Sequence, residues 1–167
     1  MPFDYYLKLD GIDAEGWERG REKWIPVLGF SYGLQQVRRG LASDDSQLYG
    51  SVHFSGLTVT KIVDETTPQL HSACITHTSI RGGQLDCIKN TRFGTHVYMS
   101  YVFTKINITA ITQNAHPAEE GKLSPPLKEE VSLVFDKVEW SATPYGPEGR
   151  PGATRKFMWS FDATKRS

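Results

Sequence analysis

The repeated alternation of apolar and polar side chains is the feature that most restricts what this chain can fold into. The run 30–35 has one apolar face and one small, polar face: Phe30, Tyr32 and Leu34 against Ser31, Gly33 and Gln35. Alternation with a period of two is typical of strands that bury one face. Runs rich in Val, Ile, Thr, Tyr and Phe recur over 4–10, 24–36, 52–63, 84–90, 95–112, 129–140 and 155–162. The pattern therefore predicts a mainly β protein.

One segment carries helix signals instead. Thr67 is expected to be the N-cap and Pro68 the first helical residue, because a missing N–H has no consequence at that position. Behind them, four side chains share one helical face: Leu70, Ala73, Cys74 and His77. Gly82-Gly83 offers a stop, although the β-branched residues from Ile75 onward favour an earlier end. We predict one short helix here.

The chain of 167 residues has no internal repeat and no low-complexity tract, so a single domain over 1–167 is expected. The predicted fold class is mainly β: a β-barrel of two packed antiparallel sheets with one short α-helix. Between the strands at 24–36 and 52–63, the range 38–51 is polar and rich in Gly, Ser and Asp, which predicts an extended loop. Pro26 cannot donate to a strand ladder, so it is expected at a strand start, an edge or a bulge.

Charge and apolar runs exclude two classes of partner. Nineteen Lys and Arg residues balance nineteen Asp and Glu residues, so no overall field attracts nucleic acid or an anionic membrane. The first residues lack the basic and apolar regions of an export signal, and no apolar run is long enough to span a bilayer. We expect no nucleic-acid partner, no direct membrane insertion and no signal peptide.

No local pattern indicates catalysis, a metal or a cofactor. The sequence has no G-x-S-x-G, G-x-x-x-x-G-K-[ST] or strand-linked G-x-G-x-x-G motif. The five histidines lack the close spacing of a local zinc site: His53, His71, His77, His96 and His116. Cys74 and Cys87 are interpreted as small buried hydrophobes, and the sequence leaves open whether they pair.

Acidic pairs are interpreted as solvated surface. They occur at Asp44-Asp45, Asp64-Glu65, Glu119-Glu120 and Glu129-Glu130. Adjacent residues of a strand point to opposite faces, so neither carboxylate of such a pair can face the other across a substrate.

The aromatic residues are more numerous than the core-facing positions require, with four Trp, seven Tyr and eight Phe. Tyr6, Tyr49 and Tyr98 fall on faces that alternation places outside. Either these faces contact other subunits, or they carry a second layer of core.

Several stretches occur together in one order along the chain. They are 4–12 (DYYLKLDGI), 27–33 (VLGFSYG), 57–61 (LTVTK), the Thr67-Pro68 to Ala73-Cys74 segment, 130–135 (EVSLVF) and 157–161 (FMWSF). The ordered set resembles the haemolysin-coregulated protein (Hcp) family, the tube subunits of type VI secretion systems, over nearly the whole length.

The resemblance implies a non-enzymatic protein that forms homo-hexameric rings, which stack into the inner tube of the secretion system. A contracting sheath propels such a tube, a spike caps it, and small effector proteins travel in its lumen. The protein would begin in the cytoplasm and leave the cell through the system without a signal peptide.

The resemblance also suggests where two surfaces lie. The serine of the family's F-S-[WY]-G stretch matches Ser31, so the small polar face of Ser31, Gly33 and Gln35 becomes the candidate lumen and effector-binding surface. The family's extended loop contacts the next ring, and its place here is occupied by a charged, Leu-containing segment: Arg38, Arg39, Leu41, Asp44 and Asp45.

Two other readings stay open at this stage. A monomeric β-barrel could bind a small apolar ligand inside each protomer. An enzyme could assemble a Cys or His nucleophile from residues distant in the sequence.

Overall fold

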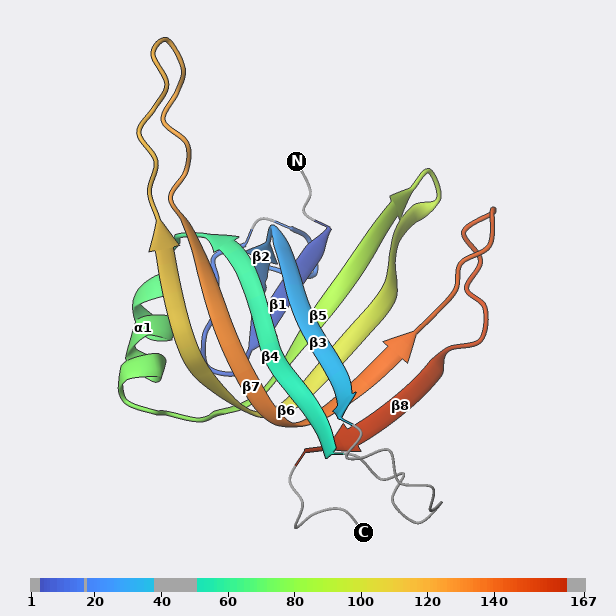
Figure 1. The fold of residues 1–167 in the computed structure, drawn as a ribbon. Helices are drawn as coiled ribbons and strands as arrows, with labels where there is room; N and C mark the ends of the chain where they lie inside the picture. Colours follow the sequence, from blue (N-terminus) through green and yellow to red (C-terminus); the bar gives the residue numbers. More distant parts are fainter. Residues whose placement is uncertain (1–3, 17, 38–50, 162–167) are drawn as a thin grey trace.

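A computed structural model describes residues 4–16, 18–37 and 51–161 of the chain. These residues form eight strands and one helix: β1 (Tyr5–Leu9), β2 (Ile25–Val27), β3 (Gly29–Val37), β4 (Ser51–Ile62), α1 (Thr67–Ile75), β5 (Ile80–Thr91), β6 (Gly94–Asn114), β7 (Lys128–Ala142) and β8 (Arg155–Ser160). Figure 1 shows how long, curved strands dominate the molecule, with α1 at one side. The predicted mainly β class with a single short helix is confirmed.

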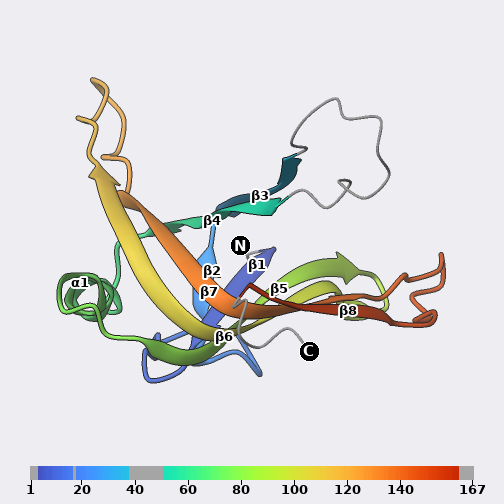
Figure 2. The same cartoon turned by 60° about the horizontal axis from the view of Figure 1, so that its bottom comes forward.

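All eight strands belong to one antiparallel sheet, in the order β2-β1-β5-β6-β7-β4-β3. β8 pairs with the second half of β7, beyond the part of β7 that pairs with β4. The prediction of two packed sheets closed into a barrel is wrong in this respect. The sheet bends round on itself but stays open (Figure 2), and among the described strands β2 and β3 do not pair.

The link between β2 and β3 explains why the sheet stays open. A single residue, Leu28, separates the two strands, and its backbone N–H donates to the Thr60 carbonyl of β4 at 2.8 Å. β3 therefore continues from β2 end to end instead of lying beside it. The predicted single strand over 24–36 is interrupted at this point, and Pro26 lies in the short edge strand β2, as its missing donor requires.

The core fills the inner face of the curved sheet and extends to α1. Its fully buried members come from six strands and the helix: Leu7, Leu9, Ile25, Val27, Leu57, Val59, Leu70, Leu85, Ile106, Val131, Leu133 and Val138. Aromatic rings pack along the same face, among them Phe103 and Phe135, whose centroids lie 4.4 Å apart. Burial of this much apolar surface is the main source of stability.

Helix α1 starts one residue earlier than its sequence signals predict. Thr66 is the N-cap, so Thr67 is already helical, and the Asp64 carboxylate accepts the Thr66 backbone N–H at 2.9 Å. The Thr67 hydroxyl is engaged elsewhere, since it accepts the Asp64 backbone N–H at 3.1 Å and donates to Glu129 at 2.7 Å. Asp64, not Thr67, therefore organises the entry to the helix.

Gly82-Gly83 does not end the helix, because α1 stops at Ile75 and both glycines lie in β5. A Cβ at Gly83 would stand 2.7 Å from the Lys8 carbonyl oxygen of β1 and 2.8 Å from Ile106 Cδ1 of β6. Glycine is therefore needed here for the close approach of neighbouring strands, a tertiary requirement that looks like a helix stop in the sequence.

The expectation of outward aromatics holds for one of its three residues. Tyr98 is 39% exposed, as predicted, whereas Tyr6 is 3% exposed and Tyr49 lies outside the described residues. Tyr6 is covered by Arg21, whose guanidinium lies 5.6 Å from the ring centroid and forms a 2.8 Å ion pair with Asp86. The segment before β2 thus folds over this face, which alternation within one strand does not reveal.

Candidate functional surfaces

The predicted polar face of β3 faces away from the core. Ser31, Gly33 and Gln35 are exposed, whereas the intervening Phe30 and Tyr32 rings pack inward. The Tyr32 ring lies 5.8 Å from that of Tyr101 in an edge-to-face arrangement. The structure therefore brings the three predicted residues together on one surface.

A β-bulge shapes this surface at Gly33. The pairing of β3 with β4 shifts between Tyr32 and Leu34, so that Ser55 and Gly56 together face Gly33. The Ser55 hydroxyl accepts the Gly33 backbone N–H at 2.8 Å, and Gly56 takes φ +84°. A Cβ at Gly33 would lie 3.2 Å from Ser55 Oγ, so the small residue keeps the surface flat here.

The polar surface is wider than β3. Ser31 lies opposite Thr58 of β4, and Thr58 lies opposite Ser132 of β7, so the three side chains share one face of the sheet. The Thr58 and Ser132 hydroxyls are 3.0 Å apart and hydrogen-bonded. We call Ser31, Gly33, Gln35, Ser55, Thr58 and Ser132 the hydroxyl face. Alternation in each strand hints at such a face, but only the register shows that the polar positions of three strands form one row.

The predicted ring-stacking residues cannot be placed on this surface. Arg38, Arg39, Leu41, Asp44 and Asp45 lie outside the described residues. The neighbouring strands show where the segment is attached, because Val37 at the end of β3 pairs with Ser51 at the start of β4.

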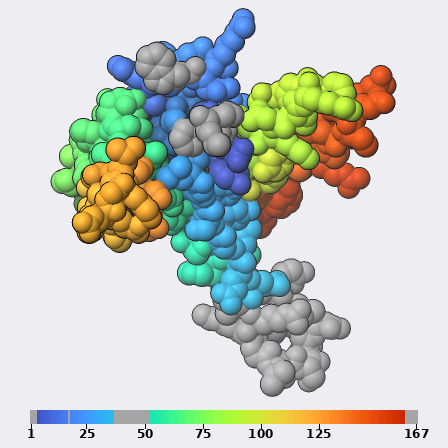
Figure 3. All heavy atoms as spheres, turned by 90° about the horizontal axis from the view of Figure 1, so that it is seen from above, coloured from blue at the N-terminus to red at the C-terminus, as the bar shows by residue number. Residues whose placement is uncertain are grey.

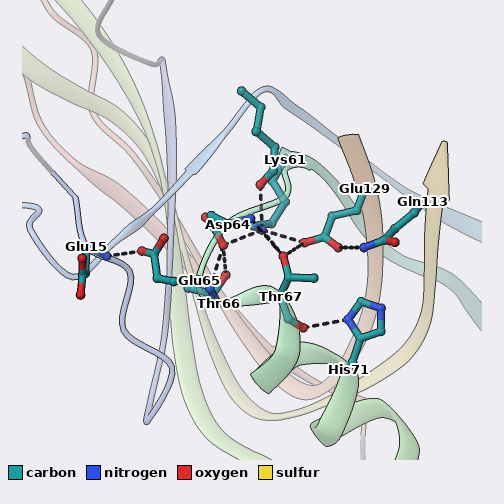
Figure 4. A network of polar contacts seen from close by, with 10 residues as sticks. Glu15, Lys61, Asp64, Glu65, Thr66, Thr67, His71, Gln113 and Glu129 are labelled. Atoms are coloured by element: carbon teal, nitrogen blue, oxygen red, sulfur yellow. Dashed lines mark hydrogen bonds and ion pairs between the residues drawn. The ribbon is translucent and has the colours of Figure 1, made fainter. Parts of the chain in front are cut away.

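A buried polar cluster lies on the opposite face, at the end of the sheet beside α1 (Figure 4). Lys61 and Glu129 face each other across β4 and β7, with side chains 1% and 0% exposed and Nζ 2.7 Å from Oε1. Thr67 Oγ1 donates to the same carboxylate oxygen, and Gln113 Nε2 of β6 donates to Oε2 at 3.1 Å. We call Lys61, Asp64, Thr67, Gln113 and Glu129 the Lys61 network.

The Lys61 network corrects the reading of Glu129-Glu130 as a solvated pair. Burial raises the pKa of Glu129, but the hydrogen bonds from Lys61, Thr67 and Gln113 and the charge of Lys61 outweigh it, so the pKa lies below its usual value. Lys61 Nζ also donates to the Ile62 carbonyl and to Asp64, each at 3.0 Å. Each charge is thus matched by several partners, which suits an anchor between helix and sheet and not a reactive group.

The thiols and histidines form no chemical centre in the described structure. Cys74 is half-buried and Cys87 buried, both are free, and burial raises the pKa of Cys87 to about 11, helped by the charge of Asp86. His71 Nδ1 lies 2.7 Å from the Thr67 carbonyl and His96 Nε2 3.2 Å from Thr91 Oγ1. Within 4–16, 18–37 and 51–161, no three His, Cys, Asp or Glu side chains gather as a metal site requires.

The described helix α1 is short, and no helix in these ranges has the length and apolar character needed to cross a bilayer.

Comparison with known proteins points in one direction. A protein-family profile described as "Type VI secretion system effector, Hcp" matches residues 6–141. A solved type six secretion system protein is similar at 25% identity, with 96% of each chain covered and a TM-score of 0.83. Hcp1 from Salmonella typhimurium is 22% identical over 98% of this chain and 97% of its own, with a TM-score of 0.74. A type VI secretion system effector from Yersinia pestis is 20% identical over 94% and 99%, with a TM-score of 0.71.

Among curated proteins, no match to this sequence was found.

Proposed function

The chain belongs to the Hcp family of type VI secretion proteins, and from this premise we propose that it forms closed six-fold rings that stack into a tube. A closed ring needs a heterologous interface, in which one surface of each copy meets a different surface of the next. The mechanism is assembly and carriage, with no catalytic step assigned to any residue of the chain.

Exposed apolar side chains on β3, β4 and β8 support this proposal. They lie in the part of the sheet away from α1, which we call the open end (Figures 1 and 2). Leu34, Val52 and Phe157 are 49%, 47% and 61% exposed, and they occupy the same side of their strands as core residues. Phe157 extends the core aromatics outward, since its ring stacks on Trp140 with centroids 5.7 Å apart. An inner face that one copy leaves uncovered is the kind of surface that association buries.

The hydroxyl face supports the proposal that effectors are carried in the lumen. It consists of small hydroxyl groups, one amide side chain and the backbone of Gly33 at the bulge, without a charged side chain among its members. A bore lined in this way offers weak, unspecific contacts, which allow cargo to enter and leave. Ser31, Gly33 and Gln35 are proposed as its lumen-facing residues on β3.

Ring formation is tested by light scattering on the purified chain. The proposal expects a particle of six times the monomer mass of 18.8 kDa. The alternative of a monomeric barrel that binds a small apolar ligand expects the monomer mass at every concentration, and that outcome would contradict the proposal.

The orientation of the hydroxyl face is tested by labelling. In a Cys74→Ser background, Ser31→Cys in assembled tubes is expected to react with a small maleimide but not with one attached to a long polymer. Ser72→Cys on α1, also an exposed serine, is the matched control and should react with both. Equal reactivity of the two variants toward the polymer reagent would place Ser31 on the outside.

Ring stacking is proposed for the segment between β3 and β4, with Arg38, Arg39, Leu41, Asp44 and Asp45 as the contacting residues. Its support is the family resemblance and its attachment to the paired ends of these strands. Deleting Asp44 and Asp45 should shorten tubes in electron micrographs while leaving single rings intact. Unchanged tube length would remove this role. Sheath, spike and small effector proteins are the further partners that the family implies, and export through the system would need no signal peptide.

A further inference from the structure

The connection between β6 and β7 projects from the sheet as an arm with an apolar tip. The two strands pair as far as Asn114 and Lys128, and residues 115–127 extend beyond them (Figure 1, upper left). A tight turn organises the tip, since the Lys122 N–H donates to the Glu119 carbonyl at 2.9 Å and the two side chains form an ion pair. Leu123 follows this turn and is 95% exposed, the most exposed of the large apolar side chains in the described chain.

A preformed cleft lies on another part of the molecule, between the β5–β6 turn and the β7–β8 connection. Its volume is about 810 Å³. The Thr143 N–H donates to the Tyr98 carbonyl at 3.0 Å, and the Tyr145 ring lies 4.6 Å from that of His96, so the β7–β8 connection is tied to β6. The cleft therefore does not depend on a ligand for its shape. We call it the prong cleft.

The prong cleft is lined by apolar side chains and by more basic than acidic ones. Tyr5, Ile88 and Tyr98 contribute apolar surface, and Lys89 and Arg155 line the cleft together with one acid, Asp4. Within the described residues, neither Lys89 nor Arg155 forms an ion pair. The site thus offers apolar burial and two basic side chains against one acidic one, an excess of positive charge.

The arm carries the complementary chemistry. Two acids, Glu119 and Glu120, and one base, Lys122, precede Leu123, so the tip has an excess of negative charge. Lys122 pairs with Glu119, whereas Glu120 forms no ion pair among the described side chains. We propose that the arm of one copy inserts Leu123 into the prong cleft of a second copy, with Glu119 and Glu120 facing Lys89 and Arg155. Burial of the leucine gives affinity, and the charges fix orientation and disfavour wrong partners.

The arm cannot fill the cleft of its own chain. Seen from above, the arm (orange, at left) lies on one side of the molecule (Figure 3). The two segments that enclose the cleft, the β5–β6 turn (yellow-green) and the β7–β8 connection (red-orange), lie at right on the other side. A contact between opposite sides of identical copies is heterologous, so each copy gives an arm to one neighbour and a cleft to the other. This inference rests on the proposed ring and names the contact between its adjacent copies.

The experiment is a cross-link between two singly substituted proteins. Leu123→Cys and Ala153→Cys, the latter on the cleft lining, are mixed under mild oxidation in a Cys74→Ser background. A covalent dimer is expected from the mixture, and a Leu123→Cys/Ala153→Cys double variant should give a ladder that ends at the closed ring. Ile75→Cys mixed with Ala153→Cys is the matched control, because Ile75 is 75% exposed but lies on α1. Equal yields from both mixtures would overturn the inference.

A charge swap adds a measurement that a folding defect does not imitate. Glu119→Lys/Glu120→Lys should raise the protein concentration needed for half-assembly by about tenfold, the effect of losing close charge pairs. Lys89→Glu/Arg155→Glu in the same chain should restore assembly. Failure of the swap to restore it, with both chains folded, would count against the contact.

The outcomes separate this inference from the proposed function. A wild-type chain that stays monomeric overturns both. A wild-type ring that survives Leu123→Asp unchanged and gives no specific cross-link overturns the arm–cleft contact alone. A small apolar dye that binds the cleft equally well in monomers and rings would show that no neighbour occupies it, and would likewise overturn the inference.

Discussion

The side chains on the inner face of the curved sheet are buried to different extents at its two ends. At the α1 end, the inner face finishes in charged side chains, yet Lys61 and Glu129 are almost completely buried because α1 and three strands supply partners for them. At the open end, the inner face carries apolar side chains that remain exposed, including Leu34 and Phe157. A residue's chemistry alone therefore does not predict its burial. The α1 end therefore buries its charged side chains within one copy, whereas the open end leaves apolar side chains exposed.

This difference predicts which substitutions should affect the stability of the fold and which should affect assembly. Removing one member of a buried ion pair leaves an uncompensated charge and is costly for the fold. Removing an apolar group that one copy leaves exposed costs the fold little and should weaken contacts between copies. Substitutions at the α1 end should therefore lower the free energy of unfolding, whereas those at the open end should weaken assembly and leave the free energy of unfolding nearly unchanged.

The largest expected effect comes from Lys61→Met. It leaves the Glu129 carboxylate buried without its cation, which should lower the free energy of unfolding by about 3–5 kcal/mol. Urea unfolding of the monomer, followed by circular dichroism, measures the loss. The double variant Lys61→Met/Glu129→Leu should recover most of it, because no buried charge remains. A double variant as unstable as the single one would break the comparison, since the α1 end would then depend on packing volume and not on charge.

The second prediction concerns acid. The folded-state pKa of Glu129 is lowered, so its contribution to stability is present above the unfolded-state pKa and is lost as the pH falls through the folded value. The stability difference between the wild type and Glu129→Gln should therefore shrink as the pH drops below about 4.3, the usual Glu value. Unfolding curves at several pH values test this. A difference that stays constant into the acid range would mean that the Glu129 carboxylate is not ionised in the fold.

The third prediction lies at the open end. Phe157→Ser should change the free energy of unfolding of the monomer by less than about 1 kcal/mol, because the side chain is 61% exposed. It should raise the concentration for half-assembly by about tenfold, since the lost apolar burial falls at the interface. Ile75→Ser, at a still more exposed apolar residue on α1, is the matched control and should leave assembly unchanged. Equal effects of the two variants on assembly would remove the distinction between the ends.

The smallest effect is expected in thiol labelling at neutral to mildly alkaline pH. With its pKa raised to about 11, Cys87 should react far more slowly than Cys74, because the thiolate is the reactive form and the sulfur is buried. A thiol reagent added to folded protein should modify Cys74 first and Cys87 only on unfolding. Rapid modification of Cys87 would reveal a reactive thiol and would revive the reading of this chain as an enzyme.

Local patterns explain which parts of the fold could be predicted. The alternation along β3 placed Ser31 and Phe30 on opposite faces, and the helix signals found α1 to within a residue at its start. Glu129 shows the limit. In the sequence it is one of two adjacent acids in a strand, and only the register that places it opposite Lys61, under Thr67, makes its burial favourable.

The same limit applies to the functional surfaces. Ser31 could be singled out within its own strand, but its row with Thr58 and Ser132 required the pairing of three strands. The arm is visible in the sequence as a polar, proline-containing connection, whereas the prong cleft combines residues from the two ends of the chain, such as Asp4 and Arg155. No local pattern links positions that far apart.

The sequence by itself determined that this protein is built from antiparallel strands with one short helix, because the two-residue period and the helix-start signals act through neighbouring residues. Tertiary structure alone decided that the strands form one open sheet, that the lysine of β4 is buried, and that apolar side chains at the open end are not. Those outcomes depend on strand register and on which faces meet, and register is set by contacts between residues far apart along the chain.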